Sequence, residues 1–107
     1  MVRIPLDGSP GTYSVADWKR DWPECLFETG IREGRVERLS RDGGPWLRVF
    51  FPKGAHGPGE GGAIWRMPVP SGEKMELRYS VRFEEGFDFN KGGKLPGLCG
   101  GPKTITG

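Results

Sequence analysis

The feature that most constrains the fold is a run of alternating apolar and polar side chains in KMELRYSVRFE, residues 74–84. Successive side chains of a β-strand point to opposite faces of the sheet, so a period of two predicts a long, half-buried antiparallel strand. A helix, with its period of 3.6, does not place these apolar side chains on one face. The apolar face holds Met75, Leu77, Tyr79, Val81 and Phe83, and the polar face holds Lys74, Glu76, Arg78, Ser80, Arg82 and Glu84.

Several shorter strand-like runs precede this segment and are separated by glycine and proline. This spacing is typical of an all-β fold, a β-sandwich or jelly roll, and we expect its strands to continue to about residue 86. The run WLRVFFPKG, residues 46–54, is apolar on both faces, which predicts a central strand covered on both sides. The predicted strands before residue 74 are 24–30, 34–40, 46–54 and 63–70.

A short helical turn is expected near residues 14–22. Ser14 stands at a cap position with Asp17 three residues later, and this pair is a helix-start signal. Trp18 and Trp22 are four residues apart and would share a helix face. They either close one end of the sandwich or stack on a sugar ring.

Length and charge limit the function classes. At 107 residues the chain is one domain or part of one, and its net charge of +2 gives no strong field that would attract nucleic acid or membrane. Its apolar runs are shorter than the ~18 residues of a membrane span. The first residues, MVRIPLDGSPG, lack the apolar core of a secretory signal. Cys25 and Cys99 form either one disulfide or two separate thiols.

The glycine-rich segment GFDFNKGGKLPGLCGG, residues 86–101, contains two lysines. Gly92 and Gly93 allow a sharp turn, and Pro96 stiffens the chain that follows Lys94. A lysine that this backbone holds in place is a compact cation suited to binding a carboxylate. The alternative is a mobile surface turn whose lysines are only solvated.

Two common ligand motifs are missing from the sequence. KGGKLPG lacks the glycine spacing of a P-loop and has Leu95 where Ser or Thr should follow the lysine. The two distant cysteines and the single histidine, His56, do not have the spacing of zinc ligands. We therefore expect neither a metal nor another cofactor.

The runs FDFNKGGKLPGLCGG and LRVFFPKGAHGPGEGGAIW, with the alternating strand between them, resemble the polysaccharide lyase family 14 alginate lyases and the neighbouring glucuronan lyases. The resemblance extends over roughly residues 46–101. It implies a β-jelly roll whose concave sheet forms a cleft for an acidic polysaccharide. Residues 1–107 would then be the N-terminal part of an incomplete jelly-roll lyase domain.

The activity implied by this resemblance is β-elimination at a uronic acid residue. The carboxylate needs a cation to stabilise an enolate-like transition state, while a base removes the neighbouring proton and an acid protonates the leaving oxygen. The essential lysine of the family motif matches Lys94, which would neutralise the carboxylate or position the substrate. Lys91 is a second candidate for substrate binding.

Four other residues are weaker site candidates. His56 lies in the loop PKGAHGPGEGG and is either a base, a contact to a sugar hydroxyl or simply an exposed side chain. Arg78 and Arg82 either follow alternate carboxylates of a polymer or form a solvated face paired with acidic neighbours. Trp65 is a candidate for substrate binding.

The family's acid and base are usually a Tyr-x-Tyr pair, whereas this chain has only Tyr13 and Tyr79. The resemblance therefore places the acid and base in sequence outside these residues, and the chain alone could be inactive. The alternative function is a non-catalytic carbohydrate-binding module that stacks sugars on its tryptophans (Trp18, Trp22, Trp46 and Trp65). A structural jelly roll would neither bind nor cleave. The expected partner is an acidic polysaccharide, the expected state a monomer, and the location, from the resemblance alone, extracellular.

Overall fold

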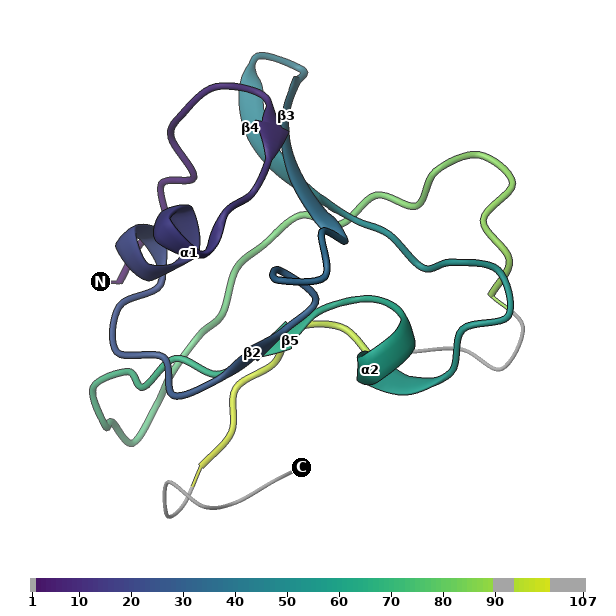
Figure 1. The fold of residues 1–107 in the computed structure, drawn as a ribbon. Helices are drawn as coiled ribbons and strands as arrows, with labels where there is room; N and C mark the ends of the chain where they lie inside the picture. The colour runs from purple at the N-terminus through teal and green to yellow at the C-terminus, as the bar shows by residue number, and fades with distance from the viewer. Residues whose placement is uncertain (1, 90–93, 101–107) are drawn as a thin grey trace. The chain divides into compact units, whose positions relative to one another are not determined.

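The computed structural model describes residues 2–89 and 94–100 (Figure 1). The chain divides into two units, Met1–Pro70 and Ser71–Gly107. All helices and strands of the described residues lie in the first unit.

The larger sheet of the first unit is antiparallel, with the strand order β1–β3–β4. Its strands are β1 (Gly11–Thr12), β3 (Val36–Arg41) and β4 (Gly44–Val49). Asp42 and Gly43 connect β3 to β4 and both have positive φ, 53° and 78°. An Asp-Gly pair with positive φ at both positions forms the two-residue hairpin turn that matches the twist of the strands.

The smaller sheet pairs β2 (Glu28–Thr29) with β5 (Ile64–Trp65), again antiparallel. The strands predicted over 24–30 and 63–70 therefore exist, but each is shortened to two residues. All pairing between strands of the described residues is antiparallel, and the chain has an all-β fold with short helices. The jelly-roll arrangement stays a prediction.

The helix α1 (Val15–Asp21) confirms the predicted helical turn. The Ser14 hydroxyl accepts a hydrogen bond from the Asp17 N–H at 3.1 Å, and the Asp17 carboxylate accepts one from the Ser14 N–H at 3.0 Å. This reciprocal capping box satisfies backbone donors that a helix start leaves without partners. Trp18 on the inner face joins the core, which consists of Tyr13, Trp18, Ile31 and Val36.

A network of polar side chains is buried beside this core. The Tyr13 hydroxyl donates to Oδ2 of Asp21 at 2.6 Å, and the Arg38 guanidinium lies over the Tyr13 ring. Nη2 of Arg38 lies 3.4 Å from Oδ1 of Asp17, and its Nη1 donates to the Ser9 carbonyl at 3.1 Å. Arg38 on β3 thus connects the N-terminal segment to both acidic residues of α1.

The prediction of a long central strand over residues 46–54 is wrong. β4 ends at Val49 and lies at the edge of its sheet, while β3 is central. Phe50 and Phe51 are 62% and 56% exposed. The second apolar face of this run is not covered by another layer within the first unit, and the Phe50 N–H turns to the Arg35 carbonyl at 2.8 Å.

Residues 74–84 form no strand ladder, contrary to the prediction that strands continue to about residue 86. Figure 1 draws this segment, in green, as an extended chain without an arrow. Its five apolar side chains are 42–49% exposed. A strand needs a neighbour that accepts and donates its backbone hydrogen bonds, and the described residues provide none for this segment.

We predict that Tyr13→Phe lowers the free energy of unfolding by roughly 1–3 kcal/mol, because the buried Asp21 carboxylate loses a donor. Tyr79→Phe is the matched control, since Tyr79 is 47% exposed and should leave stability unchanged. Urea unfolding followed by tryptophan fluorescence measures both. Equal stability of the two variants would contradict this role of the Tyr13 hydroxyl.

The capping box also predicts a pH dependence. The hydrogen bond from the Ser14 N–H, with smaller help from Arg38, lowers the pKa of Asp17 below its ordinary value of 3.8. The stabilisation is therefore present above about pH 3.8 and is lost as the pH falls through the lower folded-state pKa. Unfolding free energies measured across this range should fall more steeply for the native chain than for Asp17→Asn. Parallel curves would contradict the prediction.

Candidate functional site

His56 lies in the connection between β4 and β5. It is the N-cap residue of the short helix α2 (Gly57–Glu60), with φ −128° and ψ 128°. Its imidazole makes no capping hydrogen bond and is exposed. The histidine therefore presents ring nitrogens at the surface of the first unit, on a loop whose backbone is held by hydrogen bonds from Arg35.

The side chain of Arg35 fixes that loop. Its Nε donates to the Gly62 carbonyl at 2.9 Å, and its Nη1 lies 3.4 Å from the Gly59 carbonyl. Arg35 is buried, so these carbonyls obtain a donor where water has little access. The Gly62 N–H donates to the Phe50 carbonyl at 3.0 Å and closes the base of the loop.

Gly62 occupies a position that only glycine fits. Its φ is +69°, and a Cβ there would lie 2.6 Å from the Phe51 ring. The glycines of PGEGGA thus allow close packing between the loop and the chain that leaves β4. The sequence predicted a loop around His56, and the structure shows that this loop packs closely against the chain that leaves β4.

Trp65 stands on β5 and is partly buried. Its ring meets that of Trp22 edge-on, with the centroids 5.1 Å apart. Trp18 is buried in the core, and Nε1 of Trp46 donates to the Arg41 carbonyl at 3.0 Å. All four tryptophans therefore have packing or hydrogen-bonding contacts within the first unit. Of the two alternatives for Trp18 and Trp22, closing one end of the fold or stacking on a sugar, the contacts of both residues agree with the first.

The second unit carries the remaining described candidates. Lys94 begins the described stretch 94–100 and is exposed, whereas Lys91 lies outside the described residues. Arg78 and Arg82 are exposed on the extended segment, and Nε of Arg78 pairs with the carboxylate of Glu76. The structure thus describes His56 and Trp65 in one unit and the cationic candidates in the other.

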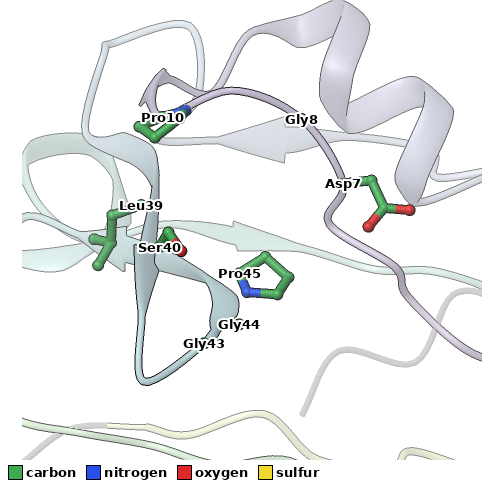
Figure 2. Close-up of a pocket in the computed structure, with 8 residues that line it drawn as sticks. All are labelled: Asp7, Gly8, Pro10, Leu39, Ser40, Gly43, Gly44 and Pro45. Atoms are coloured by element: carbon green, nitrogen blue, oxygen red, sulfur yellow. The ribbon is translucent and has the colours of Figure 1, made fainter.

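Figure 2 shows a hollow between the N-terminal segment and the β3–β4 hairpin. Its volume is about 210 Å³, and its lining includes Asp7, Ser40, Gly44 and Pro45. The charged lining group is the carboxylate of Asp7, which would repel a polyanion. None of the candidate residues lines this hollow, so it does not serve as a cleft for an acidic polysaccharide.

Cys25 and Cys99 are free thiols in the structure, and burial raises the pKa of Cys25. The described residues hold no group of three or more His, Cys, Asp and Glu side chains arranged to bind a metal ion. Within the same residues, no helix is long and apolar enough to cross a membrane.

Comparison with known proteins decides the family. The family model for polysaccharide lyase 14 matches residues 40–107, more than half of the chain. The chain belongs to the polysaccharide lyase 14 family. The matched region contains the His56 loop, β5, the alternating segment and GGKLPGL. The match confirms the resemblance to this family that these residues of the sequence indicated. Neither the curated proteins nor the solved structures gave a match.

Membership of the polysaccharide lyase 14 family indicates lyase activity at the level of the family, with a polysaccharide as the substrate class. The match begins at residue 40 and so leaves out α1 and the Arg38 network. Arg35 also precedes it, although the loop that Arg35 holds lies within it. No sequence pattern indicates this role, because Arg35 acts through carbonyls that lie 27 and 24 residues away in the chain.

We predict that Gly62→Ala destabilises the protein more than Gly54→Ala, by about 1–3 kcal/mol. Both residues have positive φ, +69° and +80°, so both variants carry backbone strain. A Cβ at position 54 meets open space, whereas one at position 62 overlaps the Phe51 ring. Urea unfolding measures the difference, and equal losses of stability would show that the close approach at Gly62 is unimportant.

Proposed function

We propose that this polysaccharide lyase 14 protein cleaves a uronic-acid-containing polysaccharide, alginate or glucuronan, by β-elimination. The observation that carries the proposal is the family match over residues 40–107, which includes GGKLPGL and its exposed lysine, Lys94. An extracellular location, expected from the family resemblance, belongs to the same proposal.

The reaction breaks one bond and forms another without an oxidant or a cofactor. A base takes the proton from the carbon next to the uronate carboxylate, and a carbon–carbon double bond forms as the glycosidic carbon–oxygen bond breaks. An acid then protonates the leaving oxygen. Negative charge grows on the carboxylate during proton removal, so a fixed cation lowers the barrier.

Lys94 is our candidate for that cation. Its ammonium is compact and carries three donors, which suits a carboxylate oxygen in a polymer. Pro96 restricts the backbone conformation of Leu95 directly after it. Lys91, three residues earlier, would bind a second acidic group of the same chain.

His56 is our candidate for the base among the described residues. An exposed imidazole on a packed loop can accept a proton, and the hydrogen bonds from Arg35 keep the loop backbone in place. Support for this role comes from the inclusion of the loop in the family match. A hydrogen bond from His56 to a sugar hydroxyl is the other contact that this position would allow.

Arg78 and Arg82 would bind further carboxylates. They are four residues apart, about 13 Å along an extended chain, and the alternation of the segment would place both on its polar face. Arg78 already pairs with Glu76, so a polymer carboxylate would compete with that ion pair. Trp65 has surface that is not covered by Trp22, and a sugar ring could stack there.

The activity is tested by incubating the protein with alginate, glucuronan and carboxyl-reduced alginate and recording the ultraviolet absorbance of unsaturated uronate. We expect the absorbance to rise with one or both acidic polymers and to stay constant with the reduced one. Binding of the acidic polymers without any rise would contradict the lyase proposal and identify a carbohydrate-binding module instead.

We predict that Lys94→Ala lowers kcat/KM on the preferred polymer by about 10²–10³, because the developing charge loses its cation. Lys94→Arg should recover part of the activity, since it keeps the charge but not the compact ammonium. Lys19→Ala, an exposed lysine on α1 that lies outside the family match, is the control and should keep full activity. Equal activity of the Lys94→Ala and Lys19→Ala variants would remove Lys94 from the mechanism.

A further inference from the structure

The short helix that follows His56 has little stability of its own. α2 has the sequence Gly-Pro-Gly-Glu, and the Gly61 N–H closes it with a hydrogen bond to the Gly57 carbonyl at 3.1 Å. Glycine and proline are the poorest helix formers, and a single helical turn is unstable by itself. The conformation of the chain after His56 therefore depends on contacts from outside the helix.

Arg35 supplies such contacts at the end of α2. The last carbonyls of a helix have no donor within the helix, and Nη1 of Arg35 lies 3.4 Å from one of them, the Gly59 carbonyl. Nε of the same guanidinium donates to the Gly62 carbonyl at 2.9 Å, just beyond the helix. One side chain thus holds the loop at two points, three and six residues after His56.

The backbone of Arg35 is fixed on both sides. Its N–H donates to the Gly30 carbonyl at 2.9 Å, and its carbonyl accepts from the Phe50 N–H at 2.8 Å. The residue is buried, with 9% of its surface exposed. The guanidinium therefore reaches the loop from a rigid base, and its removal would leave the buried Gly62 carbonyl without this donor.

A guanidinium suits this task better than an ammonium. Its donors lie in one plane at fixed angles, so two carbonyls that it binds are held in a fixed relation to each other. An ammonium is a point charge on a flexible stem, without that fixed arrangement of donors. Arg35→Lys therefore keeps the positive charge and removes the rigid link between the Gly59 and Gly62 carbonyls.

We propose that Arg35 is a positioning residue of the lyase reaction, which acts by holding the His56 loop where the imidazole can take the substrate proton. The inference rests on the proposed function, in which His56 is the base. A base must lie within hydrogen-bond reach of the proton that it removes. A displacement of about 1 Å, caused by a mutation away from the reacting atoms, can lower a rate by about 10².

Amide hydrogen exchange tests the hold on the loop without any need for lyase activity. The Gly61 and Gly62 amides donate within the loop and to the chain that leaves β4. We expect both to exchange roughly tenfold faster in Arg35→Lys than in the native chain. The Trp18 and Trp22 amides of α1 are the internal control and should keep their native rates.

Steady-state kinetics test the effect on the reaction. Arg35→Lys should lower kcat on the preferred polymer by up to about 10² and leave KM nearly unchanged, because a displaced base weakens the transition state alone. Tyr13→Phe is the control for stability, since it loses a buried hydrogen bond elsewhere in the first unit and should keep the native kcat. Arg35→Gln is a second variant if Arg35→Lys does not fold, and circular dichroism checks the folding of each protein.

A double-mutant cycle separates positioning from a merely structural role. If Arg35 acts through His56, then Arg35→Lys should cause no further loss of kcat in a His56→Ala background. A structural role would lower kcat by the same factor with and without the histidine.

Three results would overturn the inference: native exchange at Gly61 and Gly62 in the Arg35 variants, a native kcat despite faster exchange, or equal losses of kcat in both backgrounds. A native chain that forms no unsaturated uronate, or a His56→Ala variant with native kcat, contradicts the proposed function itself and the inference with it. The exchange rates and the kinetics thus show which of the two has failed.

Discussion

The buried ion pair between Arg38 and the two carboxylates of α1 is the interaction on which the first unit depends. A guanidinium that leaves water needs nearby negative charge, and Nη2 of Arg38 lies 3.4 Å from Oδ1 of Asp17 and 3.9 Å from Oδ2 of Asp21, while its Nη1 donates to the Ser9 carbonyl. These contacts hold α1 and the N-terminal segment against β3. The Tyr13 hydroxyl, whose pKa is raised by burial and by the Asp21 carboxylate, remains protonated and donates to the same group.

The strand that carries Arg38 also connects this network to the candidate site. Arg35 lies immediately before β3, and its side chain donates hydrogen bonds to carbonyls of the loop that bears His56. Trp22, at the end of α1, packs against Trp65 on β5, which follows the same loop. The conformation of the loop within the polysaccharide lyase 14 match is thus set by residues that precede the match.

Local signals in the sequence predicted local structure well. The capping box and the glycine-rich lyase motif each depend on a few adjacent residues, and the structure bears out the first and the family match the second. The alternation over residues 74–84 indicates which side chains share a face. It does not indicate which strand lies beside the segment, so the hydrogen-bonding neighbour of residues 74–84 could not be predicted. Likewise, a period of two does not distinguish the buried Arg38 from the exposed Arg48 on the neighbouring strand. Lys94 is a candidate because a motif identifies it, whereas Arg35 acts through contacts with residues distant in the sequence.

The central claim is that Lys94 meets the carboxylate of a uronate polymer. The most direct measurement is a nuclear magnetic resonance titration of the isotope-labelled chain with a short uronate oligosaccharide, followed through the backbone amides. The account predicts that the largest shifts include residues 94–98, and that these shifts disappear when the carboxyl groups of the oligosaccharide are reduced. Shifts confined to the hollow beside Asp7, or equal shifts with the reduced sugar, would contradict it.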